Sequence, residues 1–71
     1  MGIYNIKEIS LMVDMPESSL RTYLGHYIFN KYYKGKKIDV SKEFYNTLLK
    51  YLWNKRNHKY ITNVERLIKN G

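Results

Sequence analysis

Residues 5–24 read NIKEISLMVDMPESSLRTYL, and this stretch decides the fold because two short apolar patterns flank a single proline. Ile6, Ile9 and Val13 recur at helical spacing before the proline, and Leu20 and Leu24 recur four residues apart after it. The spacing predicts one helix over residues 5–13 and a second from residue 14 or 15 to residue 24. We expect the two helices to pack against each other through these apolar positions.

The turn between the two predicted helices has its own signals. Asn5 and Glu8 have the spacing of a capping box at the start of the first helix. Asp14 and Glu17 repeat that spacing at the start of the second, and Pro16 is tolerated in a first helical turn. Two short helices joined by a turn of a few residues form a helix-turn-helix, whose second helix enters the DNA major groove.

The predicted second helix turns polar residues away from its apolar side. They are short and carry one positive charge, which suits a helix lying against base edges and phosphates. An ordinary solvated helix face is the alternative explanation of the same pattern. The outward residues are Ser18, Ser19, Arg21 and Thr22.

Residues 27–40, YIFNKYYKGKKIDV, follow a glycine at position 25 that we expect to end the second helix in a left-handed cap. The strand-forming residues on either side of Gly35 predict a β-hairpin with Gly35 at its tip in positive φ. Such a basic hairpin, or wing, would lie along the phosphate backbone or in the minor groove. Tyr32 and Tyr33 would either contact DNA there or be half-buried in the sheet. The lysines on or beside the hairpin are Lys31, Lys34, Lys36, Lys37 and Lys42.

Two further helices are predicted after the hairpin. Residues 41–56 begin at the capping residue Ser41 and carry a wide apolar stripe, which should form the wall of the core. Residues 62–70 begin with Thr62 and Glu65 at capping-box spacing, and this short helix must dock on the domain or bind a partner. The stripe of residues 41–56 consists of Phe44, Tyr45, Leu48, Leu49, Leu52 and Trp53. The fold class is therefore mainly α with a small β-hairpin, in one domain over residues 1–71.

The composition limits the classes of function that the chain can have. The chain has 71 residues, 13 Lys and Arg against 6 Asp and Glu, a net charge of +7 and no cysteine. Such a positive surface attracts polyanions, and disulfides and thiolate zinc sites are excluded. No apolar run approaches the roughly 18 residues that span a bilayer. We expect a cytoplasmic protein without a membrane partner.

No pattern typical of an enzyme is present: there is no cysteine nucleophile, HExxH motif, glycine-rich phosphate loop or spaced pair of carboxylates. We therefore expect no enzyme activity, no cofactor and no metal site. The main alternative to DNA binding is a protein-binding modulator or inhibitor of a host protein, with RNA as a weaker third partner. No heptad run is long enough for a coiled-coil dimer, which predicts a monomer that assembles, if at all, on DNA.

The predicted order helix, turn, helix, hairpin, helix resembles the winged helix-turn-helix domains of MerR-type regulators and of phage or transposon excisionases. The resemblance covers roughly residues 3–56, and its best match is DMPESSLRTYL at residues 14–24, in step with the family pattern GVSPSTLRYYE. It implies a small sequence-specific double-stranded DNA-binding protein, a regulator or architectural factor of a mobile element. The residues expected to contact DNA are Ser18, Ser19, Arg21, Thr22, Lys31, Tyr32, Lys34, Gly35, Lys36 and Lys37.

Two features depart from the family pattern. Asp14 stands where the family usually has glycine, and Pro16-Glu17 replaces its Ser-Pro order, which adds a negative charge close to the expected DNA surface. The chain also lacks the long dimerisation helix and effector domain of the MerR-type regulators, so in size it is closer to an excisionase.

Overall fold

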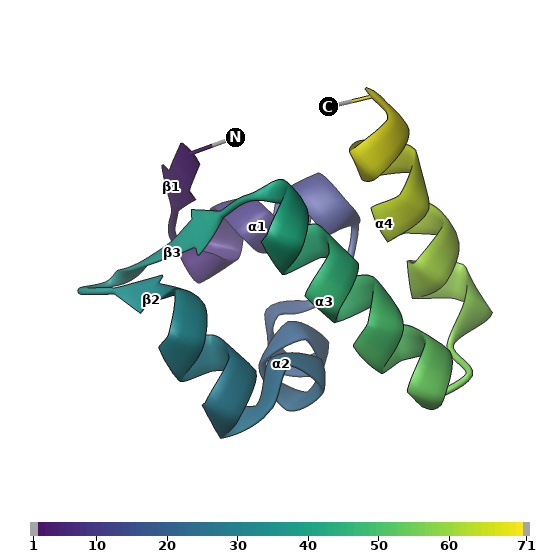
Figure 1. Ribbon diagram of the computed structural model, residues 1–71, viewed down its shortest axis with the longest axis horizontal. Helices are drawn as coiled ribbons and strands as arrows, with labels where there is room; N and C mark the ends of the chain where they lie inside the picture. Colours follow the sequence, from purple (N-terminus) through teal and green to yellow (C-terminus); the bar gives the residue numbers. More distant parts are fainter. Residues whose placement is uncertain (1, 71) are drawn as a thin grey trace.

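A computed structural model describes residues 2–70 of the chain, and of residues 26–29 it describes the backbone. The chain is mainly helical, with a small antiparallel sheet at one end (Figure 1). This confirms the coarse fold class that the sequence predicts. The elements are β1 (Gly2–Tyr4), α1 (Ile6–Val13), α2 (Glu17–Tyr32), β2 (Tyr33–Lys34), β3 (Lys37–Val40), α3 (Lys42–Asn54) and α4 (His58–Asn70).

Helix α1 starts as predicted. The Asn5 side chain accepts a hydrogen bond from the Glu8 amide at 2.8 Å, and the Asn5 amide donates to Glu8 Oε1 at 3.2 Å. The helix ends at Asp14, whose φ of 51° is left-handed and whose amide donates to the Ser10 carbonyl. Asp14 therefore closes the first helix, and its predicted role as a cap of the second helix is wrong.

The second helix starts later than predicted and continues further. Pro16 occupies its N-cap position, with no side-chain cap, and its carbonyl accepts from the Leu20 amide at 2.9 Å. Gly25 interrupts the helix with φ 62° and ψ 172°. Its φ is positive, as in a left-handed cap, but its ψ lies outside the left-handed helical region, so the predicted cap is not formed. The chain then becomes helical again as far as Tyr32. We call residues 17–24 the first half of α2 and residues 26–32 the second half.

The hairpin predicted for residues 27–40 is therefore wrong over residues 27–32, which are helical. The reason lies at Tyr32, whose side chain is 6% exposed and packs edge-to-face on Phe44, with ring centroids 5.4 Å apart. Its hydroxyl also forms a hydrogen bond with Thr47 Oγ1 at 3.0 Å. A strand ending at this residue would lose both contacts with α3.

The remaining part of the hairpin is present. Strands β2 and β3 pair antiparallel, with Tyr33 opposite Ile38, around a turn in which Gly35 has the predicted positive φ of 66°. Strand β1, which the sequence did not predict, pairs with the other edge of β3 and places Tyr4 opposite Ile38. The sheet order is β1-β3-β2.

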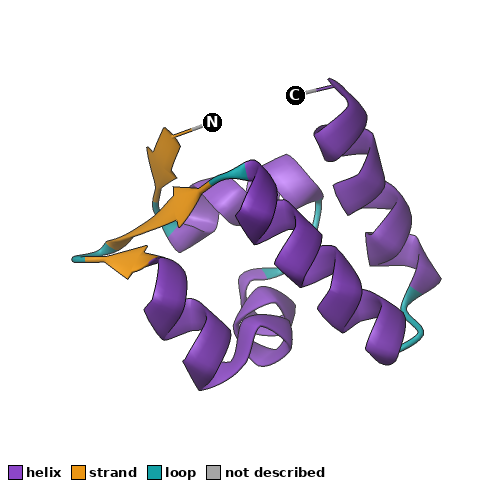
Figure 2. Cartoon of the chain, in the orientation of Figure 1, coloured by secondary structure: helices purple, strands orange, loops and turns teal. Residues whose placement is uncertain are grey.

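Helix α3 crosses the middle of the molecule (Figure 2). Ser41 Oγ accepts from the Phe44 amide at 3.1 Å, so the predicted cap is confirmed. The helix ends at Asn54 rather than at residue 56, because Arg56 adopts a left-handed φ of 55°. The predicted apolar stripe is buried at Phe44, Tyr45, Leu48 and Leu52. Trp53 departs from that prediction, since 52% of its surface is exposed.

Helix α4 begins at His58, four residues before the predicted start. Thr62 lies inside the helix, where its hydroxyl donates to the His58 carbonyl at 3.0 Å, so it is not a cap. Asn57 takes that place: its Oδ1 accepts from the Tyr60 amide at 3.4 Å. Ile61 and Val64 are buried, so the helix docks on the domain.

One hydrophobic core joins these elements. It contains buried side chains from α1, both halves of α2, β3, α3 and α4. The core therefore fixes the first half of α2 relative to the sheet and to α3.

In the described part of the chain, no helix combines the length and apolar character needed to cross a membrane.

Candidate nucleic-acid interface

The first half of α2 has one anchored side and one open side. Leu20 and Leu24 are fully buried and fix the helix on the core. Residues on the opposite side lie one helical turn apart and point to solvent. Among the four predicted contact residues of this helix, Ser18, Arg21 and Thr22 are exposed and Ser19 is partly buried. The structure thus presents a rigid polar surface of three adjacent side chains.

The polar groups on this surface differ in how they are already used. Thr22 Oγ1 donates to the Ser18 carbonyl at 2.9 Å, so its proton is used within the helix while its lone pairs face solvent. Arg21 forms no ion pair with any described residue. Its guanidinium is free to donate two parallel hydrogen bonds to a guanine edge or to a phosphate.

The β2–β3 hairpin gathers positive charge at its turn. Lys34, Gly35, Lys36 and Lys37 are all exposed, as predicted contact residues must be. Lys34 Nζ pairs with Asp39 Oδ2 at 3.2 Å, whereas Lys36 and Lys37 pair with no described acid. Because an exposed ion pair contributes about 0–1 kcal/mol, Lys34 can exchange Asp39 for a phosphate at little cost.

The two remaining predicted contact residues, Lys31 and Tyr32, differ in their exposure to solvent. Lys31 is exposed, and its ammonium lies 3.0 Å from Glu43 Oε1 and 5.4 Å from the centroid of the Tyr32 ring. The hydrogen bond and the charge from Lys31 hold the pKa of Glu43 below its usual value. Tyr32 itself is a core residue, so its ring is not available to stack on DNA. We therefore leave Tyr32 out of the candidate interface.

A basic turn that the sequence analysis missed lies beside the first half of α2. Tyr23 contacts Tyr51 and Tyr60 edge-to-face at 6.4 and 5.9 Å, and its hydroxyl accepts from Asn57 Nδ2 at 2.6 Å. These contacts bring the turn between α3 and α4 against α2. The exposed cations of this turn are Lys55, Arg56 and Lys59.

A signal for this turn was present in the sequence. Residues 54–59 read NKRNHK, a basic run that lies between Tyr51 and Tyr60 in the sequence. The ammonium groups of Lys55 and Lys59 lie over the rings of Tyr51 and Tyr60, at 5.5 and 5.6 Å from the centroids. What the sequence could not show is that Tyr23, more than 30 residues away, packs on these same rings.

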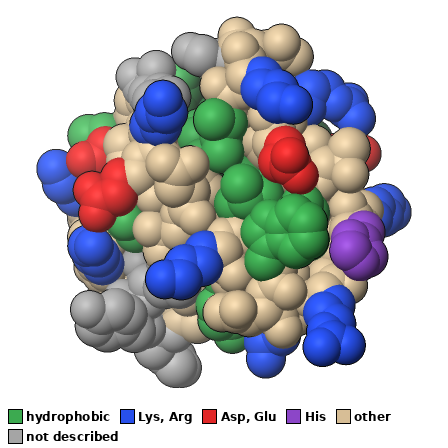
Figure 3. Space-filling view, turned by 45° about the vertical axis from the view of Figure 1, so that its right-hand side comes forward, with side chains coloured by type: hydrophobic (Ala, Val, Ile, Leu, Met, Phe, Trp, Pro, Cys, Tyr) green, Lys and Arg blue, Asp and Glu red, His purple; other side chains and the backbone are tan. Residues whose placement is uncertain are grey.

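The opposite side of α3 has a different character. Trp53 lies two residues after Tyr51, which turns its side chain about 200° around the helix and away from α2. Its ring meets His58 edge-to-face with centroids 6.0 Å apart. Figure 3 shows this α3–α4 side, where apolar side chains gather at the centre and basic side chains surround them.

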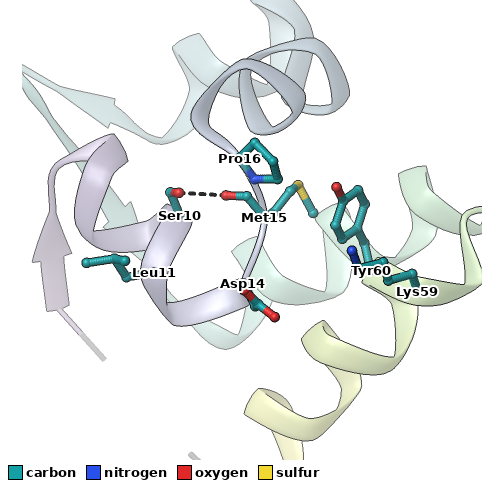
Figure 4. Close-up of a pocket in the computed structure, with 7 residues that line it drawn as sticks. All are labelled: Ser10, Leu11, Asp14, Met15, Pro16, Lys59 and Tyr60. Atoms are coloured by element: carbon teal, nitrogen blue, oxygen red, sulfur yellow. Dashed lines mark hydrogen bonds between the residues drawn. The ribbon is translucent and has the colours of Figure 1, made fainter.

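A shallow depression of about 360 Å³ lies where the turn between α1 and α2 meets the start of α4 (Figure 4). Ser10 Oγ donates across it to the Met15 carbonyl at 2.6 Å, and Asn63 Nδ2 donates to the Asp14 carbonyl at 3.4 Å. These bonds hold the turn in place. The lining residues are Ser10, Leu11, Asp14, Met15, Pro16, Lys59 and Tyr60. The depression borders the start of α2, and the two hydrogen bonds help to fix the position of that start.

Comparisons with known proteins supply no relative. No protein-family model, curated protein or solved structure matches this chain. Among the side chains that the structure describes, which exclude those of residues 26–29, no group of three or more His, Cys, Asp or Glu is placed to hold a metal ion. The function is therefore argued from the surfaces described above.

Proposed function

We propose that this chain is a small sequence-specific double-stranded DNA-binding protein with a winged helix-turn-helix fold. The first half of α2 enters the major groove, and the β2–β3 hairpin lies on the phosphate backbone or in the minor groove. In this account the protein serves a mobile element as a regulator or as an excisionase-like architectural factor. It acts as a monomer in solution, because no long heptad repeat offers a dimer interface.

One observation carries the proposal: the open side of the first half of α2 presents Ser18, Arg21 and Thr22 while Leu20 and Leu24 anchor its other side. A helix held rigidly by its apolar side and presenting short polar side chains and one guanidinium suits base-edge and phosphate contacts. The sheet supports the same interpretation, because its hairpin follows α2 directly and carries cations at an exposed turn.

Charge supplies the second support. Two of the six acidic residues, Asp39 and Glu43, are paired with lysines near the hairpin, whereas Arg21, Lys36 and Lys37 have no acidic partner among the described residues. The turn that packs beside the first half of α2 adds the positive charges of Lys55, Arg56 and Lys59. Concentrated like charge lowers stability unless a polyanion neutralises it. A DNA backbone in contact with both regions would do so.

The experiment that tests this function is a salt titration of binding to random duplex DNA. We expect log affinity to fall linearly with log salt concentration, with a slope of about −0.9 for each neutralised phosphate. Binding to duplex that is undetectable at low salt would overturn the proposal.

A second candidate function, binding to a host protein, is favoured by one specific observation. Trp53 is half exposed on the α3–α4 side, and exposed tryptophans are enriched among residues that dominate protein interfaces. Under this alternative, Trp53→Ala abolishes the chain's effect on its partner and Arg21→Ala does not. Under the DNA-binding proposal, Trp53→Ala leaves the affinity for duplex unchanged.

A further inference from the structure

The first half of α2, which we propose to face DNA, carries one carboxylate, that of Glu17. Glu17 is the first residue of α2 and is exposed, and Arg21 lies one turn later on the same edge of the helix. Glutamate followed by arginine at this spacing favours an ion pair on a helix. Neither residue has an ion-pair partner within the described part of the chain. Both side chains are therefore free to reach a ligand.

A free carboxylate at this position is costly near most of the DNA surface. Phosphates repel it, and so do the acceptors that guanine, adenine N7 and thymine O4 present in the major groove. The amino groups of cytosine N4 and adenine N6 are the donors available there. Glutamate pairs with cytosine N4, and arginine pairs in bidentate fashion with guanine O6 and N7. The two side chains are thus complementary to the two bases of a G·C pair.

We propose that Glu17 determines specificity by accepting a hydrogen bond from a cytosine amino group while Arg21 donates to a guanine. Four residues of helix rise about 6 Å, just under two base-pair steps of about 3.4 Å. The two contacts therefore fall within about two base-pair steps of each other. The preferred site contains a G·C pair under the first turn of α2. This inference rests on the proposed DNA-binding function.

An acidic residue in a first helical turn also has a purely structural use, because it stabilises the positive end of the helix dipole. That use affects the thermal unfolding of the protein and leaves base preference unchanged. The two roles are therefore separated by measuring which sequences are bound, rather than by measuring stability alone.

The test compares wild type with Glu17→Gln, which keeps the size of the side chain and removes its charge. Duplexes bound from a random pool are sequenced, and affinity for random duplex is measured on the same samples. We expect Glu17→Gln to bind random duplex more tightly, because a repulsive charge is gone. We also expect its discrimination at one G·C pair to fall by about 5- to 150-fold, the value of one good base contact.

Glu65→Gln on α4 is the matched control, since it changes the net charge equally outside the first half of α2. We expect it to keep the wild-type base preference. An unchanged base preference in folded Glu17→Gln would overturn this inference alone. If the preference that Glu17→Gln loses is for an A·T pair rather than a G·C pair, the assignment of Glu17 to cytosine is wrong. A wild-type chain that binds no duplex would overturn the proposed function and this inference with it.

Discussion

Tyr23 joins the first half of α2 to the turn between α3 and α4. Its ring packs on Tyr51 and Tyr60, and its hydroxyl accepts a hydrogen bond from Asn57, which also caps α4. One side chain therefore sets how the candidate recognition helix sits against the basic turn.

Removing this hydroxyl tests how much the link contributes. We expect Tyr23→Phe to lower the free energy of unfolding by about 1 kcal/mol, the net contribution of a typical hydrogen bond, while the ring contacts remain. Chemical denaturation measures the change. Tyr51→Phe is the control, because no hydrogen bond to the Tyr51 hydroxyl is found among the described residues. Equal losses in the two variants would mean that the Tyr23 hydroxyl contributes nothing specific.

Tyr45 makes stability depend on alkaline pH. Burial raises the pKa of its phenol, and the neighbouring Tyr4 raises that pKa further. In the unfolded chain the phenol ionises near its ordinary pKa of about 10. The contribution of Tyr45 to stability is therefore fully present below that pH, and it is lost as pH rises towards the higher pKa of the folded state.

The corresponding variant is Tyr45→Phe, which cannot ionise. We expect its free energy of unfolding to fall less steeply than that of wild type as pH rises above about 10, and denaturation at several pH values measures this. Parallel curves for the two proteins would contradict the assignment of the alkaline loss to Tyr45.

At the scale of elements, local signals predicted the structure well. Helices α1 and α3 each start at one capping residue, Asn5 or Ser41. Its side-chain oxygen accepts a hydrogen bond from the backbone amide three residues later. The positive φ of Gly25 and Gly35 was also predictable, because glycine adopts that conformation without a Cβ clash. In each case the deciding contacts lie within a few residues in the sequence.

The errors occurred where distant contacts decide. The strand-forming residues after Gly25 favoured a hairpin, but packing of Tyr32 on Phe44 stabilises a second helical half. Strand β1 exists because it pairs with β3, more than 30 residues away. At α4, Asn57 and Thr62 are both residue types that can cap a helix, but only Asn57 does so, because burial of Ile61 selects the earlier start. A pattern of local propensity contains none of this information.

The candidate site shows the same division. Exposure of Ser18, Arg21 and Thr22 followed from helical periodicity once Leu20 and Leu24 were assigned to the core. The burial of Tyr32, which removes it from the candidate interface, could not be predicted because its position depends on the second half of α2. The basic turn at residues 55–59 was missed because its proximity to α2 depends on contacts made by Tyr23.

The β2–β3 hairpin is tested as a unit. Changing Lys34, Lys36 and Lys37 together to Ala should weaken binding to specific and random duplex alike, and should flatten the salt slope by about one unit per lost phosphate contact. The control changes Lys50, Arg66 and Lys69 to Ala, which removes the same charge from α3 and α4. A hairpin variant that binds as tightly as this control would show that the hairpin does not contact DNA.

At the scale of the whole molecule, one core supports two different surfaces. The first half of α2 packs beside the basic turn, and the basic hairpin follows the second half of α2 in sequence. The α3–α4 side carries the exposed Trp53, which packs on His58.

Whether the first half of α2 is the recognition element is decided by Arg21→Ala. Thermal unfolding and affinity for duplex DNA are measured on the same sample, beside Arg66→Ala as an exposed helical control. We expect Arg21→Ala to lose about 1–3 kcal/mol of DNA affinity while its stability changes by less than about 0.5 kcal/mol. Wild-type affinity in a folded Arg21→Ala protein would show that this helix does not contact DNA and would favour the protein-binding alternative.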